Sequence, residues 1–270
     1  MKIAKVIAQG MSRAAILHAA LLAAITFAPS RTVAQVEYVD PTIGNVGILL
    51  VPTRPAVYMP NSMVRMYPLR ADATDDRIES FPLTINSHRM QELFSIMPGA
   101  GAGPAAYDQE KTTPYYYSTR FDDSLIQTEF TATERAGYFR FTFPQAQASV
   151  VLSNRMAGDL QIQAAGVVSG EERFSDMKAF VYGEFNAPVA FKVETMGDKK
   201  RVTASSQTAK VLEFRYGVSF IGVEQAEKNL RREIPAWGFG KIKDAGKARW
   251  NETLGRIAVE GGTESQRKVF

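Results

Sequence analysis

The chain has 270 residues, no cysteine, two histidines and a formal net charge of +4. The absence of cysteine excludes disulfides, thiolate metal sites and cysteine nucleophiles. The first 34 residues hold four basic residues and no acid, so the rest balances 28 basic residues (32 less 4) against 28 acids, without the basic excess of a nucleic-acid-binding domain.

The first predicted element is a secretory signal peptide over residues 1–34. Basic residues precede an apolar run at 14–28, and small residues follow at 32–34, as in the charged, apolar and cleavage regions of such a peptide. Cleavage is predicted after Ala34, with Met11 as an alternative start of translation. A membrane anchor is the alternative interpretation, but it needs about 20 apolar residues. We therefore expect a periplasmic or secreted protein with no membrane span after cleavage.

The next region is rich in proline. Eight prolines between Val36 and Ala106 disfavour long helices and central strands. Short strands are predicted at Gly47–Val51 and Met63–Tyr67, joined by ordered loops. Arg54 and Tyr58 fall in such a loop, and loops of this type often carry recognition residues. Both are candidates for ligand binding, and a purely structural role is the alternative.

From Tyr115 to Ser219, apolar and polar residues alternate with a period of two. In Tyr138–Phe143 the three phenylalanines share one face, which is typical of a half-buried strand. The same pattern predicts strands at Tyr115–Phe121, Leu125–Thr133, Ala148–Ser153, Lys178–Phe185, Ala190–Met196 and Val211–Ser219. Many short strands with no helices between them indicate an antiparallel β-sandwich. We expect this domain to span residues 35–222.

After Ser219 the period changes to that of a helix. Helices are predicted at Val223–Glu233 and Lys241–Leu254, which together form a helical linker over residues 223–257. Trp237 and Trp250 are expected to anchor this linker rather than to bind a ligand.

The last residues predict the start of one more helix. Thr263 and Gln266 have the spacing of a capping box, yet the sequence ends one turn later, at Phe270. A helix of that length is not stable in water by itself. We therefore expect the chain to be the front portion of a longer protein, in which residues 258–270 begin a second domain.

Two stretches, Thr112–Pro144 and Val218–Phe270, resemble the N-terminal domain of glycoside hydrolase family 92, and Val39–Gly44 matches a weaker opening motif. This family consists of secreted bacterial exo-acting α-mannosidases. The resemblance implies a galactose-mutarotase-like β-supersandwich that leads through a helical linker into an (α/α)6 barrel.

The resemblance also implies the chemistry and the partners. Family members are inverting, calcium-dependent enzymes whose catalytic carboxylates and Ca²⁺ ligands come from the barrel, so no catalytic or metal-binding residue is assigned here. The chain alone is expected to be inactive. Its expected partners are a mannose-containing glycan, such as an N-glycan or a mannan, and its own C-terminal barrel. A stand-alone, non-catalytic carbohydrate-binding or structural module is the alternative.

Loops of the sandwich domain help to shape the mannose pocket in the family, which singles out His88. Glu110 stands out separately, because with Asp108 it could be taken for a paired-carboxylate site. His88 lies in Ser87–Met90, which matches a histidine-containing family segment. It is predicted to bind a sugar hydroxyl, and packing beside Phe94 is the alternative. Glu110 is predicted to bind substrate with Arg54 and Tyr58. The alternative for Glu110 is a solvated loop with local ion pairs.

Overall fold

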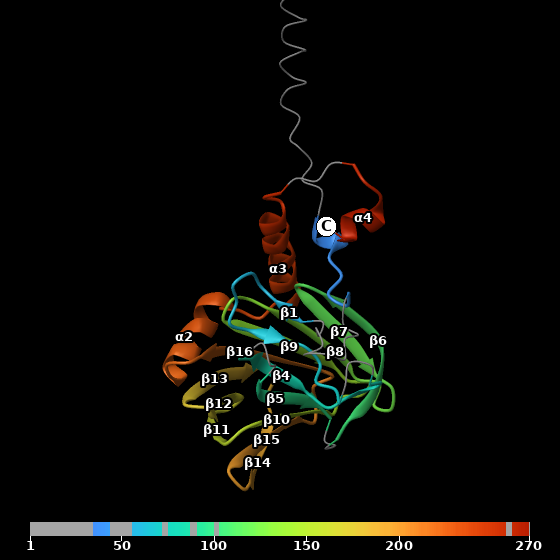
Figure 1. Ribbon diagram of the computed structural model, residues 1–270. Helices are drawn as coiled ribbons and strands as arrows, with labels where there is room; N and C mark the ends of the chain where they lie inside the picture. The colour runs from blue at the N-terminus through green and yellow to red at the C-terminus, as the bar shows by residue number, and fades with distance from the viewer. Residues whose placement is uncertain are drawn as a thin grey trace, which may run out of the picture. The chain divides into compact units, whose positions relative to one another are not determined.

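The computed structural model describes residues 35–43, 56–71, 75–86, 91–99, 103–257 and 261–269. Most of this part of the chain is antiparallel strand, and helices follow the last strand (Figure 1), which confirms the predicted fold class. The strands are β1 (Val57–Tyr58), β2 (Arg65–Met66), β3 (Arg77–Ile78), β4 (Phe81–Ile85), β5 (Glu92–Pro98), β6 (Ala105–Thr113), β7 (Tyr116–Phe121), β8 (Gln127–Ala132), β9 (Ala136–Thr142), β10 (Ala148–Ser153), β11 (Gly158–Ala164), β12 (Val167–Phe174), β13 (Met177–Phe185), β14 (Ala190–Met196), β15 (Lys199–Ser206) and β16 (Val211–Ser219). The helices are the 3-10 turn η2 (Gln35–Tyr38), α2 (Val223–Glu233), α3 (Phe239–Leu254) and α4 (Glu264–Val269).

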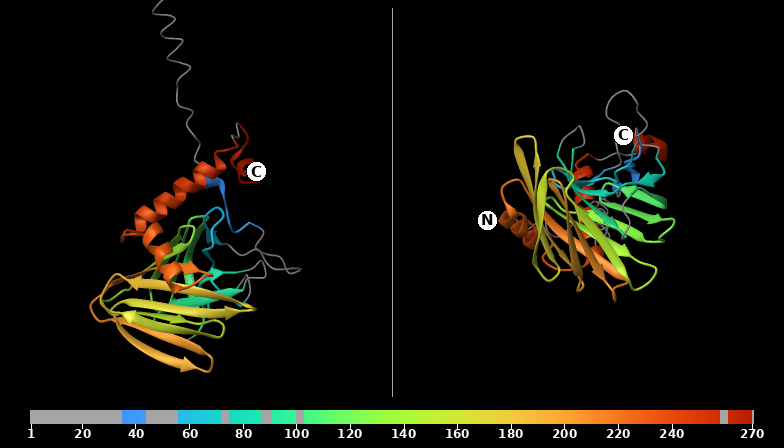
Figure 2. Two further views of the ribbon diagram at one scale, coloured as in Figure 1. Left: turned by 90° about the vertical axis from the view of Figure 1, so that its left-hand side faces the viewer. Right: turned by 90° about the horizontal axis from the view of Figure 1, so that it is seen from below.

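Two sheets pack face to face and form the sandwich (Figure 2). The larger has nine strands in the order β11-β12-β13-β16-β9-β8-β7-β6-β3, and the smaller has five in the order β14-β15-β10-β5-β4. β1 and β2 form a separate two-stranded ribbon. The strand pairs are antiparallel, as the short spacing of the predicted strands indicates.

The core between the sheets is rich in aromatic side chains. Phe139 and Phe141 of β9 are fully buried and stack with their ring centroids 5.6 Å apart. Phe81, from the smaller sheet, contacts Phe139 at 5.9 Å. The predicted apolar face of β9 is therefore confirmed. The prediction of an open opposite face is wrong, because Tyr138 is also fully buried beneath the helical linker.

Several predicted strands match the structure closely, and their deviations have local causes. β10, β14, β16 and helix α2 have the predicted bounds. β8 begins two residues late because Leu125 has a positive φ of 56° in the preceding turn. The predicted strand Gly47–Val51 lies outside the described residues. Pro82 does lie in a strand, β4, but that strand is at the edge of its sheet. An edge strand has one side without a neighbouring strand, so the missing N–H of a proline costs no hydrogen bond there.

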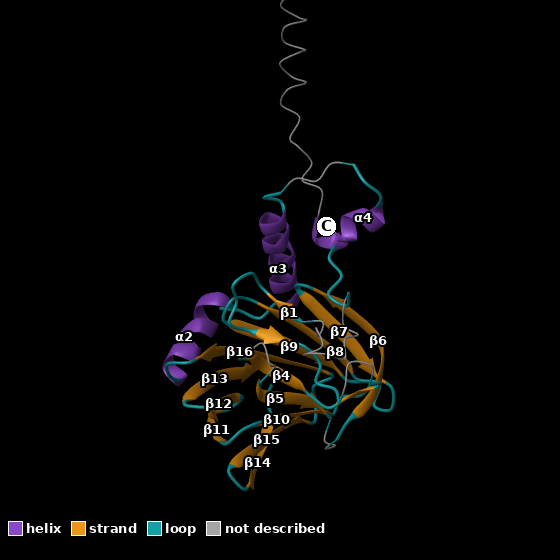
Figure 3. Cartoon of the chain, viewed as in Figure 1, coloured by secondary structure: helices purple, strands orange, loops and turns teal. Residues whose placement is uncertain are grey.

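Helix α2 covers the outer face of the larger sheet (Figure 3), where it packs mainly on β16 and β13. Leu230 and Ile234 join Tyr138 in a second apolar cluster on this face. The approach of the helix depends on Gly217 of β16. A Cβ atom at this position would lie 2.1 Å from the carbonyl oxygen of Ala226, which is far inside contact distance.

Helix α3 connects distant parts of the chain. The indole N–H of Trp250 donates to the carbonyl oxygen of Tyr58 at 2.9 Å, and the two rings meet edge to face at 5.8 Å. The side chain of Asn251 accepts a hydrogen bond of 3.0 Å from the backbone N–H of Val36 in η2. Trp250 thus anchors the linker, as predicted.

The capping box at the last helix is confirmed. The backbone N–H of Thr263 donates to the Gln266 side chain at 2.8 Å, and the Gln266 N–H donates back to the Thr263 hydroxyl at 3.3 Å. The predicted start of this helix is therefore correct. Among the helices of the described ranges, none has the length and apolar character that crossing a membrane requires.

Candidate functional site

Two of the four predicted substrate-binding residues, Tyr58 and Glu110, lie in described parts of the chain. Arg54 and His88 lie outside them. Tyr58 ends strand β1 and Glu110 lies within β6, so neither residue is in an irregular loop. Glu110 is exposed and ion-paired, as its alternative interpretation expected, but it projects from a strand rather than from a loop.

Glu110 owes its position to a β-bulge. Asp108 pairs with Arg120 and Lys111 with Ser118, so β6 has one residue more than β7 between these two pairs. Gln109, inside the bulge, has a positive φ of 54°, which is uncommon for a residue other than glycine. Such bulges redirect side chains and often lie beside binding sites.

The redirected carboxylate of Glu110 meets two partners. Its Oε1 atom accepts a hydrogen bond of 2.9 Å from the Tyr117 hydroxyl and forms an ion pair with the Arg70 guanidinium. Tyr117 is fully buried, and this burial raises its pKa well above the usual value. Tyr117 therefore stays a neutral donor at physiological pH, and the ion pair is held at the edge of the core.

Arg70 retains binding capacity. Only 9% of it is exposed, its guanidinium lies 4.8 Å from the centre of the Tyr107 ring, and its Nε atom is buried without a hydrogen-bond partner among the described residues. A buried donor without a partner is costly, which makes this atom a candidate contact for a ligand or an ordered water. We call Arg70, Tyr107, Glu110 and Tyr117 the edge cluster.

Described residues near the Arg54 and His88 segments pack together in one small cluster. One member of this cluster, Tyr67, is close to Arg70 in the sequence. Tyr67 packs with Leu69, Ile85 and Ala56 in a small apolar cluster. Ala56 begins the described chain after the Arg54 segment, and Ile85 ends the strand before the His88 segment. At the next position after Ile85, the backbone N–H of Asn86 donates a hydrogen bond of 2.9 Å to the carbonyl oxygen of Gln91, between β4 and β5. Ala56 and Ile85, near the borders of the two undescribed segments, thus belong to one cluster with Tyr67, three positions before Arg70.

Tyr58 is held by contacts within the protein. Besides its contact with Trp250, its ring lies 5.0 Å from the guanidinium carbon of Arg65, and its N–H donates to the carbonyl oxygen of Pro114 at 3.0 Å. These contacts give Tyr58 a structural role at the junction of β1 and α3. Its contact with a sugar stays a prediction.

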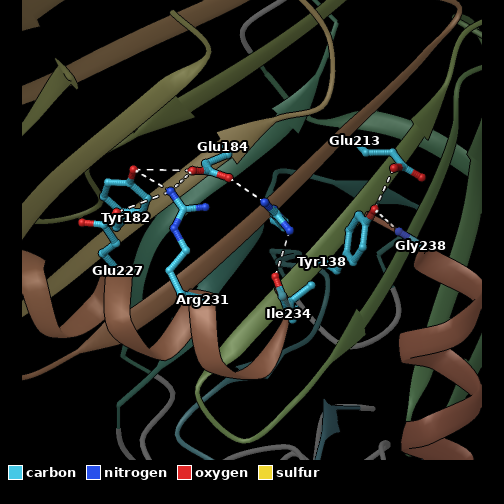
Figure 4. Close-up of polar contacts among 9 residues, drawn as sticks. Tyr138, Tyr182, Glu184, Glu213, Glu227, Arg231, Ile234 and Gly238 are labelled. Atoms are coloured by element: carbon cyan, nitrogen blue, oxygen red, sulfur yellow. Dashed lines mark hydrogen bonds and ion pairs between the residues drawn. The ribbon is translucent and has the colours of Figure 1, made fainter. Parts of the chain in front are cut away.

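A second polar network holds the linker on the outer face of the larger sheet (Figure 4). Glu184 of β13 forms ion pairs with Arg215, at 2.9 Å, and with Arg231 of α2. Arg215 also donates to the carbonyl oxygen of Ile234 at 2.9 Å, just after the helix ends. Burial raises the pKa of Glu184, but the two guanidinium groups outweigh burial and hold it below the usual value. Glu184 therefore remains ionised and joins sheet to helix.

The same network continues to the start of α3. The Tyr138 hydroxyl donates to Glu213 at 2.7 Å and accepts a hydrogen bond of 3.1 Å from the Gly238 N–H. The Trp237 ring lies 5.9 Å from that of Tyr138 and 4.4 Å from the Arg215 guanidinium. Trp237 is thus an anchor of the linker, as predicted. The sequence showed only that these side chains alternate along their strands, so their joint role was missed.

The described residues do not fit a calcium site. No group of three or more Asp, Glu, His or Cys side chains in the described ranges lies close enough together to hold a metal ion. Ca²⁺ takes six to eight oxygen ligands, among which Asp and Glu carboxylates supply the negative charge. No step is therefore assigned to a metal in this part of the chain.

The described chain is thus an antiparallel β-sandwich continued by helices, one of which packs on its outer face. The family model described as the glycosyl hydrolase family 92 N-terminal domain matches residues 38–227, and that of the family 92 catalytic domain matches residues 225–270. The chain belongs to glycosyl hydrolase family 92.

Solved structures agree with this assignment. A family GH92 inverting mannosidase from Bacteroides thetaiotaomicron is 27% identical and superposes with a TM-score of 0.80 over 87% of this chain and 38% of its own. A second GH92 α-mannosidase from Bacteroides thetaiotaomicron is 17% identical, with a TM-score of 0.74 over 88% of this chain and 40% of its own, and shows the shared fold.

A curated relative, described as an uncharacterized secreted glycosidase of Arthroderma benhamiae, is 26% identical over 202 residues. The alignment covers 57% of this chain and 26% of that protein. The chain thus spans about a quarter of the curated relative and about two fifths of the solved relatives.

Proposed function

We propose that the chain is the N-terminal domain of an exported α-mannosidase-like glycosidase that acts on N-glycans or mannans. The observation that carries this proposal is the family match, which continues from the sandwich domain at 38–227 into the catalytic domain at 225–270. Mannose is favoured because the solved relative at 27% identity is described as an inverting mannosidase.

In this proposal the sandwich supplies one wall of the substrate pocket, and the edge cluster supplies polar contacts. The Glu110 carboxylate accepts hydrogen bonds from sugar hydroxyls, and the unpartnered Nε–H of Arg70 donates to a sugar oxygen. Their ion pair orients both groups before a sugar binds, which lowers the entropy lost on binding. Arg54, Tyr58 and His88 are proposed as further substrate contacts.

The reaction itself is proposed to take place on residues outside this chain. Inversion requires one carboxylic acid at the leaving oxygen and one carboxylate that activates water, about 6.5–9.5 Å apart. Both are assigned to the catalytic domain, as is the Ca²⁺ ion that the family resemblance implies. The residues of this chain bind and orient the sugar and keep bulk water from one side of it. The 270-residue chain alone is therefore proposed to be inactive.

Export is part of the proposal. Residues 1–34 are proposed to be a signal peptide that is cleaved after Ala34, which would deliver the protein to the periplasm or the medium. The description of the curated relative as secreted supports this location.

The test compares two single variants of the gene product that contains this chain together with its catalytic domain. Glu110→Gln removes the charge of the edge cluster, and Asp123→Asn removes a charge from an exposed turn as the matched control. Hydrolysis of 4-nitrophenyl α-mannoside and α-mannobiose is followed with and without EDTA. Loss of a hydrogen bond to a charged group costs about 1.5–3 kcal/mol, so Glu110→Gln is expected to lower kcat/KM by about tenfold to a hundredfold.

Three results would count against the proposal. Equal kcat/KM values for the two variants would show that Glu110 does not contact the substrate. Full activity in EDTA would show that the reaction does not require calcium. Glycan binding by the 270-residue chain, combined with no hydrolysis of any α-mannoside by the full product, would favour the alternative of a carbohydrate-binding module. Thermal midpoints of both variants separate lost binding from lost folding.

A further inference from the structure

An open groove lies on the outer face of the larger sheet, beside the first turns of α2. It has a volume of about 740 Å³ and is lined by β11, β12 and β13 and by residues at the start of α2. Tyr182 and Glu227, which line it, are labelled in Figure 4 together with Arg231, which contacts both. Four strands separate β13 from β6, so this groove is at the opposite end of the sheet from the edge cluster.

The register of three strands places hydrogen-bonding side chains in rows across the groove. Gln161 pairs with Ser169, and Ser169 pairs with Tyr182, so an amide, a hydroxyl and a phenol stand side by side. Asp159 and Glu171 form the neighbouring row. Since side chains at alternate positions share a face of the sheet, both rows project to the outer face.

Hydrogen bonds between these side chains fix their orientation. The amide nitrogen of Gln163 donates to the Ser169 hydroxyl at 2.7 Å, and that of Gln161 donates to Asp159 at 2.8 Å. Gln161 and Gln163 are both exposed, and they project from a strand rather than from a loop. Oriented amides on a rigid sheet lose little entropy when a ligand binds.

Three of the four acids that line the groove are paired with a base, and Glu224 is the fourth. Asp159 pairs with Lys200, Glu171 pairs with Lys178 at 2.8 Å, and Glu227 pairs with Arg231 at 3.4 Å. Within the described ranges, these acids form no group that could hold a metal ion. A strongly polar lining whose acids are mostly paired favours a neutral ligand with many hydroxyl groups over a cation or an apolar molecule.

We propose that this groove binds a neutral oligosaccharide built of hexose units, at a site separate from the substrate pocket. Amide and carboxylate side chains side by side can accept from and donate to adjacent hydroxyls of one sugar ring. Tyr182 adds a phenol hydroxyl, which can donate to or accept from a sugar hydroxyl. The volume is in the range of ordinary small-molecule sites.

The test uses the full 270-residue chain and isothermal titration with mannotetraose and with cellotetraose. The double variant Gln161→Ala/Gln163→Ala removes the two exposed amides of the groove. The matched control, Gln145→Ala/Gln147→Ala, removes two exposed amides from the turn between β9 and β10. We expect the groove variant to weaken binding of at least one tetrasaccharide by about tenfold or more, since each amide contributes at least one hydrogen bond.

The control variant and added EDTA are each expected to leave this affinity unchanged. Failure of the substrate-pocket proposal shows in the kcat/KM of Glu110→Gln, and failure of the groove proposal shows in the affinity of the glutamine pair. Equal affinities of the groove variant and the unmodified chain would overturn the groove proposal. So would loss of binding in EDTA, or the absence of binding of both sugars at millimolar concentration.

Discussion

Substitution of Gly217 by alanine tests how closely helix α2 lies on the sheet. The added Cβ atom would lie 2.1 Å from the carbonyl oxygen of Ala226 and 2.8 Å from the backbone nitrogen of Leu230. Both atoms belong to the helix backbone, so no side chain can rotate away. Because Cβ contacts below about 3.0 Å essentially do not occur, α2 has to withdraw by roughly 1 Å.

The withdrawal loosens the contacts of the buried side chains Ala226 and Leu230 against the sheet. Overpacking of a core usually costs about 1–3 kcal/mol, and a clash between backbones belongs at the upper end, near 3 kcal/mol. For a domain of this size, 3 kcal/mol lowers the thermal midpoint by about 6–12 °C.

Gly240→Ala in α3 is the matched control. A Cβ atom there meets nothing within 4 Å, and the φ of Gly240 is not positive. Alanine favours a helix over glycine by about 1 kcal/mol, so the midpoint is expected to rise by a few degrees. Differential scanning fluorimetry and urea titration measure both changes. A Gly217→Ala midpoint equal to that of the unmodified chain would refute the close approach of α2 to β16.

Three further predictions concern stability. Burial raises the pKa of Glu172 from 4.5 to about 7, so between these pH values the folded state holds a proton that the unfolded state has lost. The free energy of unfolding is therefore expected to fall as the pH rises from about 4.5 to 7. Glu172→Gln should flatten this pH dependence in urea titrations. Arg215→Met leaves the carboxylate of Glu184 poorly paired and is expected to lower the free energy of unfolding by about 3 kcal/mol. Arg231→Met, at a side chain that is 46% exposed, should lower it by less than about 1 kcal/mol. Similar losses in the two variants would contradict the roles assigned to these arginines. Trp250→Ala removes the hydrogen bond to Tyr58 and the contact between the two rings. The free energy of unfolding is expected to fall by about 2 kcal/mol, and amide hydrogen exchange in α3 is expected to become faster. Unchanged exchange in α3 would show that this anchor is dispensable.

Strands with one buried face could be predicted from the sequence. β10, with alternating buried and half-buried residues, was predicted to the residue. β4 could not be predicted this way, because all five of its residues are buried and it contains a proline. β6 was also missed, since none of its residues is fully buried and its bulge shifts the alternation by one position. Period-two patterns report burial on one face only, and both strands depart from that condition.

The candidate site was only partly accessible from the sequence. Glu110 was chosen as one of two neighbouring carboxylates, with Asp108, but its partner Arg70 lies 40 positions earlier and carries no local pattern. The bulge contains Gln109, whose backbone has a positive φ. A glycine or an asparagine at this position would have suggested such a conformation in the sequence, but a glutamine does not. The linker network was missed for a similar reason. Its ion pairs join residues 31 or more positions apart, such as Glu184 and Arg215, across strands whose register the sequence does not show.

The contact between η2 and α3 sets an order of events during synthesis of the chain. Val36 and Gln35 bind Asn251 and Ile257, which lie 215 and 222 positions later. At about 5–20 residues per second, a ribosome needs roughly 10–45 s to make the intervening chain. Gln35 and Val36 therefore have no hydrogen-bond partners in the linker until the linker has emerged from the ribosome. A nascent chain that stalls before residue 251 would expose this segment to proteases and chaperones even if every strand of the sandwich had already been made.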